Sequence, residues 1–314
     1  MRVILNYKRV LALGTGGLWS WMGYNYLKDR RRCIEYEVEP SKLLIAKMIP
    51  WTLMSKSTGF LAEIRIPIRL RELIYGSYAR LFGCNLEEMK APNLKVYENF
   101  NEFFGRKLKD NSRAIENAIM ISPCDGRVLV AGRVADGFIE QVKGVKYKLN
   151  HLLGTEKLGE SEDLHYCAIY LGPGDYHRFH SPVNNWKVKQ IKQITGDLFS
   201  VSPRFMKQVV FVSKLNERTV IEGNWSHGQM TMVPVGACNV GSILLNDLKQ
   251  GDFLKKGQEV GRFQMGSMVV LVFSAPKDFE WKIQPGDPIK LGQSIITQTK
   301  SSYFSYLNIF SYIF

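Results

Sequence analysis

A chain of 314 residues with 45% hydrophobic and 23% charged residues has the composition of a globular protein, and it can bury the core of one large domain or two small ones. Its 42 Lys and Arg residues against 29 Asp and Glu residues give a net charge of +13, which favours an anionic partner, either nucleic acid or an acidic membrane. The sequence has no zinc-finger spacing, RNA-binding aromatic motif or long basic tract, which disfavours nucleic acid, and its five widely spaced cysteines disfavour a disulfide framework or a zinc site.

The N-terminal segment, residues 1–33, has the features of a membrane anchor or of a targeting peptide. Residues 10–27 carry no charge, include four aromatic residues and are flanked by basic residues, and their 18 positions just reach the thickness of a bilayer core. Small and polar residues dilute this run, however. The absence of acidic residues before Asp29 also fits a mitochondrial transit peptide, and a frayed terminus is the third alternative.

Residues 34–117 are expected to form a helical region that faces a membrane. A first helical run ends at Pro50, and a second follows Pro67. In the second run, apolar residues recur at intervals of four, four and three: Leu70, Ile74, Tyr78 and Leu81. Basic residues between them predict a basic amphipathic helix pair on anionic lipid, and a solvated basic face on an ordinary helical subdomain is the alternative. Residues 99–108 predict another short helix.

From residue 118 to residue 300, short apolar runs between Gly, Asp and Pro predict a core that is mainly a β barrel or sandwich, so the fold class is α+β. The predicted strands are 128–130, 168–171, 209–212, 219–221, 230–235 and 269–273. The segment 251–260 recurs as 286–295, which predicts paired hairpins and is also typical of lipoyl and biotinyl carrier domains. The uncharged aromatic tail, 301–314, receives no role.

A Gly-Ser pair, Gly266 and Ser267, precedes the apolar strand 269–273. Such a pair is commonly a turn or a bulge. In the alternative interpretation, the hydroxyl of Ser267 attacks the carbonyl of Gly266, since a glycine has no Cβ to obstruct the approach. Elimination from the resulting ester would break the chain and leave dehydroalanine, which hydrolyses to a pyruvoyl group.

The segment 261–267, Gly-Arg-Phe-Gln-Met-Gly-Ser, resembles the processing site of the phosphatidylserine decarboxylase family, usually written Gly-Arg-Phe, two residues, then Gly-Ser-Thr or Gly-Ser-Ser. Three further motifs resemble the family in the same order, with 101–104 upstream: 122–126, 175–180 and 196–201. The resemblance spans about residues 40–297. Met268 departs from the usual Thr or Ser, and the alternative is therefore a lipid-binding relative that is not processed.

The resemblance implies a processing triad of Asp125, His180 and Ser267. In this triad Asp125 orients His180, and His180 takes the proton from Ser267. His177 matches the residue tied to decarboxylation, in proton transfer. From the residues alone, two structural histidines, a metal-binding His-x-x-His pair and a turn role for the Asp-Gly sequence at Asp125 remain alternatives. No metal is expected.

Self-cleavage between Gly266 and Ser267 would give a large chain, 1–266, and a small chain, 267–314. The family's reaction converts phosphatidylserine to phosphatidylethanolamine. A pyruvoyl group on residue 267 forms a Schiff base with the substrate amine and accepts the electrons released as carbon dioxide departs. By the same resemblance, Phe199 and Ser200 are candidates for binding the substrate.

The expected partners are phosphatidylserine in an anionic membrane and the small chain itself, with a homodimer left open. The mitochondrial inner membrane is the expected location, and the endoplasmic reticulum is the alternative. Two rival functions fit less well. A lipoyl or biotin carrier needs an exposed Lys, which 265–268 lacks, and the basic, aromatic N-terminus disfavours a pyruvoyl enzyme that acts on a soluble amino acid.

Overall fold

The computed structural model describes residues 59–142, 145–155, 163–196, 216–236, 243–264, 267–276 and 278–298. All of these residues belong to one compact unit. The predictions for the N-terminal segment, the first helical run, the strand 209–212 and the aromatic tail lie outside the described residues.

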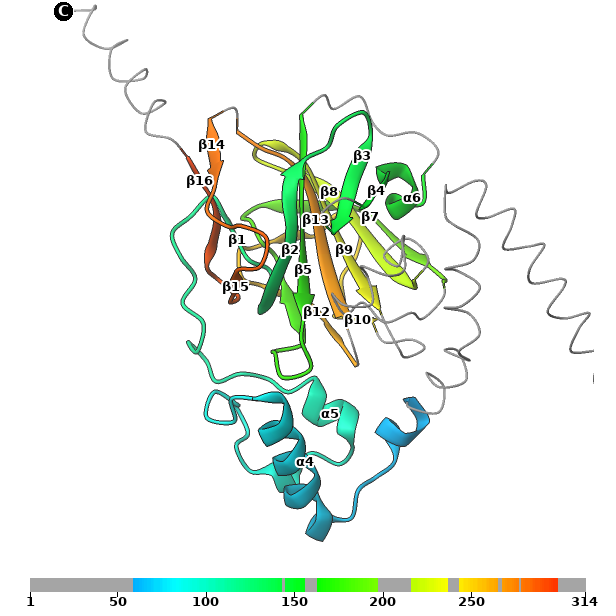
Figure 1. Ribbon diagram of the computed structural model, residues 1–314, viewed down its shortest axis with the longest axis vertical. Coiled ribbons are helices and arrows are strands. Elements are labelled where there is room, and N and C mark those ends of the chain that lie inside the picture. The colour runs from blue at the N-terminus through cyan, green and yellow to red at the C-terminus, as the bar shows by residue number, and fades with distance from the viewer. Residues whose placement is uncertain are drawn as a thin grey trace, which may run out of the picture. The chain divides into compact units, whose positions relative to one another are not determined.

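An antiparallel sheet of eight strands forms the core, in the order β11-β7-β8-β9-β13-β5-β2-β15 (Figure 1). Its strands are β2 (Gly126–Arg133), β5 (Leu164–Leu171), β7 (Trp186–Ile194), β8 (Arg218–Trp225), β9 (Gly228–Gly236), β11 (Phe253–Leu254), β13 (Ser267–Ser274) and β15 (Pro288–Ile289). The apolar run in β13 is paired on both sides and fully buried, as expected of β-branched residues in a central strand. Five of the six predicted strands are confirmed here.

The described residues form three smaller sheets besides the large one. They have the orders β1-β16-β14, β10-β12-β6 and β3-β4. Their strands are β1 (Met120–Ile121), β3 (Phe138–Val142), β4 (Val145–Lys148), β6 (Arg178–His180), β10 (Ile243–Leu245), β12 (Glu259–Phe263), β14 (Phe279–Trp281) and β16 (Ser294–Gln298). The mainly β core with few helices confirms the predicted α+β class.

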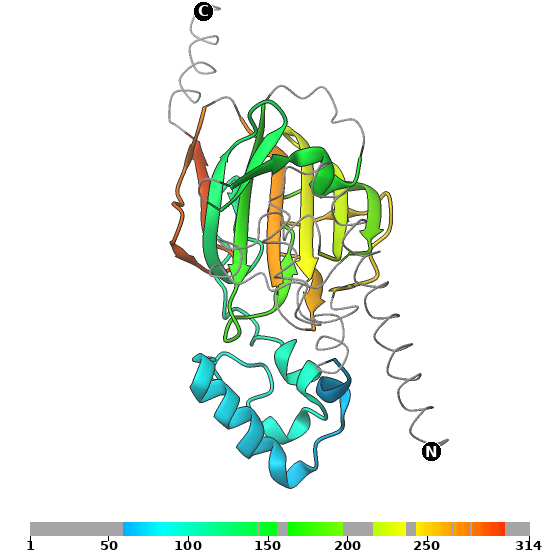
Figure 2. The ribbon, with the colours of Figure 1, turned by 45° about the vertical axis from the view of Figure 1, so that its right-hand side comes forward.

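The helices that lie wholly within the described residues are α4 (Ile68–Phe82), the 3-10 helix η1 (Leu94–Val96), α5 (Phe100–Phe104) and α6 (Leu149–Leu153), and residues 59–63 are also helical. The run predicted after Pro67 is α4, and it ends at Gly83, which takes the left-handed conformation that glycine favours at a helix C-terminus. It buries Tyr75 and Ala79, and the ring of Tyr75 stacks on Phe103 of α5 at 4.7 Å. Figure 2 shows α4 and α5 together below one end of the large sheet.

The helix predicted for 99–108 is shorter than expected. The side chain of Asn99 caps it by accepting a hydrogen bond from the backbone N–H of Glu102, but the helix ends at Phe104. The carbonyl of Gly105 instead accepts from Nε of Arg178 at 2.9 Å, which ties the chain to β6. Within the described segments, no helix is both long and apolar enough to cross a bilayer.

The two copies of the Gly-Asp repeat adopt the same loop. Each Asp accepts from the backbone N–H three residues before it, at 2.8 Å in both copies, and each Gln does the same at 3.0 and 2.7 Å: Asp252, Gln258, Asp287 and Gln293. The predicted paired hairpins are wrong, however. β11 pairs with β7 and β12 with β6, while β15 pairs with β2 and β16 with β1, so each loop joins the large sheet to a small one.

Candidate active site

Ser267 opens the central strand of the large sheet. It lies opposite Leu171 at the end of β5 and Gly236 at the end of β9. The residue is fully buried, and its Oγ has no hydrogen-bond partner among the described residues. A buried hydroxyl without a partner is unusual, since burial removes water as an alternative acceptor. Gly266, the other residue of the predicted cleavage site, lies outside the described residues.

The loop after β5 carries the predicted histidines to this end of the sheet. Gly172 donates its N–H to Oδ2 of Asp175 at 2.6 Å, which closes the turn that the Gly-Pro-Gly sequence predicts. The loop then enters β6, and the carbonyl of His177 accepts from the N–H of Phe263 at 2.9 Å. Phe263 lies four positions before Ser267, so the histidine loop is attached to the segment that leads to the predicted cleavage site.

His177 is held in one tautomer. Its Nδ1 lies 2.9 Å from the carbonyl of Asp175, and a carbonyl only accepts, so Nδ1 carries the proton. Nε2 is then left with its lone pair, and it has no partner in the part of the chain that the structure describes. The ring lies 3.9 Å from that of Phe104, centroid to centroid. Burial lowers the pKa of His177 to about 3, which keeps the imidazole neutral.

His180 is also neutral, but both of its ring nitrogens are occupied. Nδ1 donates to the carbonyl of Gly257 at 2.9 Å, and Nε2 accepts from the hydroxyl of Tyr176 at 3.1 Å. Burial lowers the pKa of His180, and the hydrogen bond to Gly257 and the charge of Glu259 oppose that shift. The sequence analysis did not identify Tyr176 as a hydrogen-bond partner of His180, although Tyr176 stands inside the motif 175–180.

Asp125 is held by an arginine that the sequence analysis missed. Nη2 of Arg113 lies 2.5 Å from Oδ2, Nε lies 3.1 Å from Oδ1, and the N–H of Leu291 donates to Oδ1 at 2.8 Å. Arg113 also pairs with Glu88 at 2.7 Å and holds the pKa of that carboxyl below its usual range. No motif surrounds Arg113 or Glu88 in the sequence, and the two residues are 25 positions apart.

The structure brings the turn with Asp125 next to His180, because the backbone N–H of His180 donates to the carbonyl of Pro123 at 2.8 Å. No side-chain hydrogen bond joins Asp125, His180 and Ser267 to one another in the described ranges, so the triad stays a prediction. Phe199 and Ser200 lie outside those ranges. Among the residues with a described placement, no three His, Cys, Asp or Glu side chains gather as metal ligands would.

The sequence is similar to that of known proteins over most of its length. A sequence model of the phosphatidylserine decarboxylase family matches residues 100–297. The mitochondrial phosphatidylserine decarboxylase proenzyme of Caenorhabditis elegans is 37% identical over 311 residues, which cover 91% of this chain and 82% of that protein. That of Cricetulus griseus is 35% identical and covers 91% and 83%, and proenzyme 1 of Schizosaccharomyces pombe is 30% identical and covers 93% and 92%. The chain belongs to the phosphatidylserine decarboxylase family.

In this family member, Asn184 occupies the position in one half of the internal repeat that Asp125 occupies in the other half. Oδ1 of Asn184 accepts from the N–H of Lys256 at 3.0 Å, and Lys256 occupies the same place in its Gly-Asp loop as Leu291 does in the other. Asp125 and Asn184 therefore make the same turn contact in the two halves. The carboxylate of Asp125 adds a negative charge to a position whose structural role an amide can fill.

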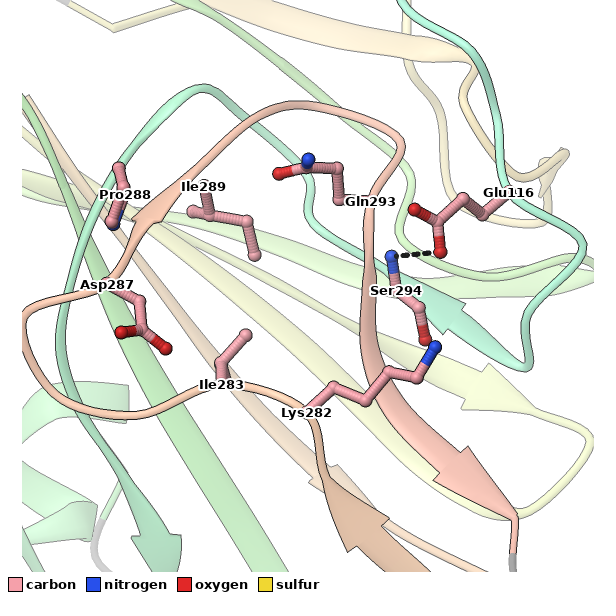
Figure 3. Close-up of a pocket in the computed structure, with 8 residues that line it drawn as sticks. All are labelled: Glu116, Lys282, Ile283, Asp287, Pro288, Ile289, Gln293 and Ser294. Atoms are coloured by element: carbon pink, nitrogen blue, oxygen red, sulfur yellow. Dashed lines mark hydrogen bonds between the residues drawn. The ribbon is translucent and has the colours of Figure 1, made fainter.

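A cavity of about 450 Å³ lies beside the second Gly-Asp loop (Figure 3). Its lining includes Glu116, which accepts from the N–H of Ser294 at 3.0 Å, and Lys282. Its lining contains none of the four predicted catalytic residues. It does adjoin the motif 122–126, because Ile289 in its lining pairs with Gly126 and the same loop carries Leu291, whose N–H donates to Asp125.

Proposed function

We propose that this chain decarboxylates phosphatidylserine to phosphatidylethanolamine and makes its own pyruvoyl group from Ser267. The observation that carries the proposal is the buried, unpartnered Oγ of Ser267 at the start of β13, within the family's Gly-Ser motif. The relatives are named phosphatidylserine decarboxylase proenzymes, and the word proenzyme supports a chain that is cleaved. A pyruvoyl group supplies an electron sink for the bond that breaks when carbon dioxide leaves.

In self-cleavage, Oγ of Ser267 attacks the carbonyl of Gly266, and Nε2 of His180 accepts the hydroxyl proton. The C–N bond between the two residues breaks as the proton passes to the leaving amine, which gives the ester. Elimination then releases the Gly266 carboxylate, and hydrolysis of the dehydroalanine releases ammonia and leaves the pyruvoyl group.

Nε2 of His180 accepts from Tyr176 in the described state, so the Tyr176 hydroxyl must turn away before His180 can act as a base. The resulting imidazolium is unfavourable in a buried site. The negative charge of Asp125 opposes that penalty, because it raises the pKa of His180.

In the decarboxylation step, His177 is the proposed proton carrier. Its Nε2 has a free lone pair, and Nδ1 fixes the orientation of the ring. Burial lowers the pKa of the imidazole, so protonated His177 is a strong acid. It therefore transfers the proton on Nε2 readily to the carbon that has lost its carboxylate. Phe104 packs on the ring and excludes water from one side of it.

Membrane contact is proposed for the outer face of α4. This helix buries only Tyr75 and Ala79, and its Leu, Ile and Phe side chains are exposed, among them Leu73 at 63% and Leu81 at 76%. Arg69 and Arg80 lie on the same helix. An apolar face with basic neighbours fits the surface of a bilayer that contains acidic lipid, which is also where phosphatidylserine is found.

The large and small chains are proposed to stay together after cleavage. β13 begins at Ser267 and pairs along its length with β5 and β9 of the large chain, so separation would expose the most buried strand of the core. The location is proposed to be a mitochondrial membrane, because the relatives are named mitochondrial. A homodimer and the inner membrane in particular remain expectations.

The deciding experiment is the intact mass of the purified protein under denaturing conditions, together with release of carbon dioxide from labelled phosphatidylserine. We expect two chains, one ending at Gly266 and one beginning with a pyruvoyl group at 267, and activity that Ser267→Ala abolishes. A single full-length chain without activity would instead support the unprocessed lipid-binding alternative.

Membrane contact is tested separately by flotation with vesicles that contain phosphatidylserine. Leu73→Glu combined with Leu81→Glu should reduce the bound fraction at least severalfold, because charged side chains do not enter the acyl boundary. Phe253→Glu is the matched control, since Phe253 is 62% exposed but lies on the edge strand β11. Equal binding of both variants would contradict the role of α4.

A further inference from the structure

Arg106, just after α5, is a buried cation with unused donors. The residue is 3% exposed. Its Nη2 donates to the carbonyls of Gly174 at 2.9 Å and Asp175 at 3.3 Å, but Nε and Nη1 have no hydrogen-bond partner within the described parts of the chain. A guanidinium has five N–H donors in a fixed plane, so the donors on Nε and Nη1 are left without an acceptor among the described residues.

The charge of Arg106 is also left unmatched. Among the described residues, no carboxylate forms an ion pair with it. Its neighbours include the ring of Phe103 at 5.4 Å, the Tyr78 hydroxyl and the Cys84 thiol, and a hydrogen bond from Arg106 lowers the pKa of that thiol against the effect of burial. Burial raises the pKa of Cys84 and of Tyr78, so both are neutral near pH 7. The Asp175 carboxylate interacts with Arg106 at longer range but is already used by Gly172. An unpaired buried cation is costly, which indicates that an anion completes the site.

Arg106 lies beside the catalytic candidates. The carbonyl of Asp175 accepts from both Nη2 of Arg106 and Nδ1 of His177, so the two side chains are anchored to one oxygen atom. His177 and Ser267 are each fully buried, as Arg106 nearly is. All three residues therefore have unpartnered polar atoms, and they lie on connected segments at one end of the sheet. Because the site is buried, its effective dielectric constant is low, and this strengthens the attraction between opposite charges.

We propose that Arg106 binds the phosphodiester of the substrate headgroup. The inference rests on the proposed function and deepens it. The headgroup carries two anions, a carboxylate and a phosphodiester, and both are acceptors for a guanidinium. The carboxylate loses its charge as carbon dioxide forms, so a cation bound to it would stabilise the ground state more than the transition state. The phosphodiester keeps its charge throughout, and only one oxygen and one carbon separate its phosphorus from the reacting carbon.

The test uses the full chain in mixed micelles of a nonionic detergent and phosphatidylserine. It compares the wild type with Arg106→Gln and Arg106→Lys. We expect all three to self-cleave, with KM raised about ten- to hundredfold in Arg106→Gln, the range for a lost charge-assisted hydrogen bond, and less in Arg106→Lys. Arg133→Gln is the matched control, because Arg133 is exposed and pairs with an exposed Asp163.

The second readout is inhibition by glycerophosphoethanolamine, which has the phosphodiester and the amine but no carboxylate. Its inhibition constant should rise in Arg106→Gln by the same factor as KM. A raised KM with unchanged inhibition would assign Arg106 to the carboxylate and overturn the proposal. Loss of self-cleavage in both Arg106→Gln and Arg106→Lys would also overturn it, since that result shows a role in holding the histidine loop. An inactive, uncleaved wild type would instead refute the proposed function.

Discussion

Arg113 holds both carboxylate oxygens of Asp125, with Nη2 2.5 Å from Oδ2 and Nε 3.1 Å from Oδ1, and each side chain is only 9% exposed. Removing one partner of a buried pair leaves the other charge without compensation. We therefore expect Arg113→Gln to lower the free energy of unfolding by about 3 kcal/mol or more. Urea unfolding in a Ser267→Ala background, which keeps every variant in one chain, measures this.

The control for this prediction is Arg133→Gln, which breaks the exposed pair with Asp163. Exposed pairs contribute about 0 to 1 kcal/mol, so its effect should be small. If the two variants lost similar amounts of unfolding free energy, the buried Arg113–Asp125 pair would contribute no more stability than an exposed ion pair.

Asp125→Asn should separate structure from chemistry. Asn184 makes the equivalent turn contact in the other half of the repeat, so an amide at position 125 can keep the hydrogen bond from the N–H of Leu291. We expect a smaller loss of stability than in Arg113→Gln, because Arg113 keeps its ion pair with Glu88. We expect little or no self-cleavage, because the negative charge that supports a protonated His180 is gone. Intact mass reports cleavage and urea unfolding reports stability. Full cleavage in this variant would remove Asp125 from the processing triad.

Met268→Thr tests the departure from the family motif. Met268 is fully buried in β13, between Tyr170 and Val235 on the neighbouring strands. The substitution removes apolar volume and buries a hydroxyl, which should cost about 2 to 4 kcal/mol. The cleaved fraction should not increase, because we propose that cleavage proceeds with Met at this position. A larger cleaved fraction in the variant would show that Met268 limits processing.

Acid should destabilise the protein through its buried histidines. An unfolded His takes up a proton near pH 6.5, whereas burial lowers the pKa of His177 in the fold to about 3. Stability is therefore retained above about pH 6.5 and lost as the pH falls towards 3, by up to about 1.4 kcal/mol per pH unit for this group. His180 shifts in the same direction.

The prediction is measured by urea unfolding between pH 7.5 and pH 5 in the Ser267→Ala background, with and without His177→Asn. The variant should lose less stability on acidification than its parent, although His180 still contributes. An identical pH dependence in the two proteins would place the acid sensitivity in other groups.

Local sequence patterns predicted the elements well but not their partners. The apolar run in β13 and the spacing in α4 are properties of neighbouring residues, and both elements form where expected. The Gly-Asp loops also form, but each joins strands whose partners come from distant segments, so the hairpin prediction was wrong. A turn signal specifies local backbone shape and does not specify what the flanking strands pair with.

In the candidate site, too, sequence patterns identified some residues and missed others. Ser267, His177 and His180 could be proposed as candidates because they stand in short motifs that resemble those of the family. Arg113 and Arg106 could not, because each acts through a contact that only the folded chain creates: Arg113 with Asp125, and Arg106 with carbonyls about 70 positions away. Isolated arginines in a chain with 42 basic residues carry no local signal of this kind.

Gly261, the first residue of the processing motif, has a packing role that predicts a strong substitution effect. A Cβ at this position would lie 2.5 Å from the carbonyl oxygen of Leu244 and 2.6 Å from the ring of Phe179, so the small sheet β10-β12-β6 closes only around a glycine. Gly261→Ala should therefore destabilise the protein by about 2 kcal/mol or more and slow cleavage, since β12 leads directly to the cleavage site.

Gly76→Ala is the matched control for this change. Apart from the neighbouring residues and the backbone of its own helix, no atom lies within 4 Å of the Cβ that it would add, and Gly76 lies inside α4, where alanine is the better helix former. It should raise the free energy of unfolding by about 0.5 to 1 kcal/mol and leave cleavage unchanged. Urea unfolding in the Ser267→Ala background compares the two variants. If Gly261→Ala were as harmless as Gly76→Ala, the motif's glycine would have to be explained by the cleavage chemistry rather than by packing.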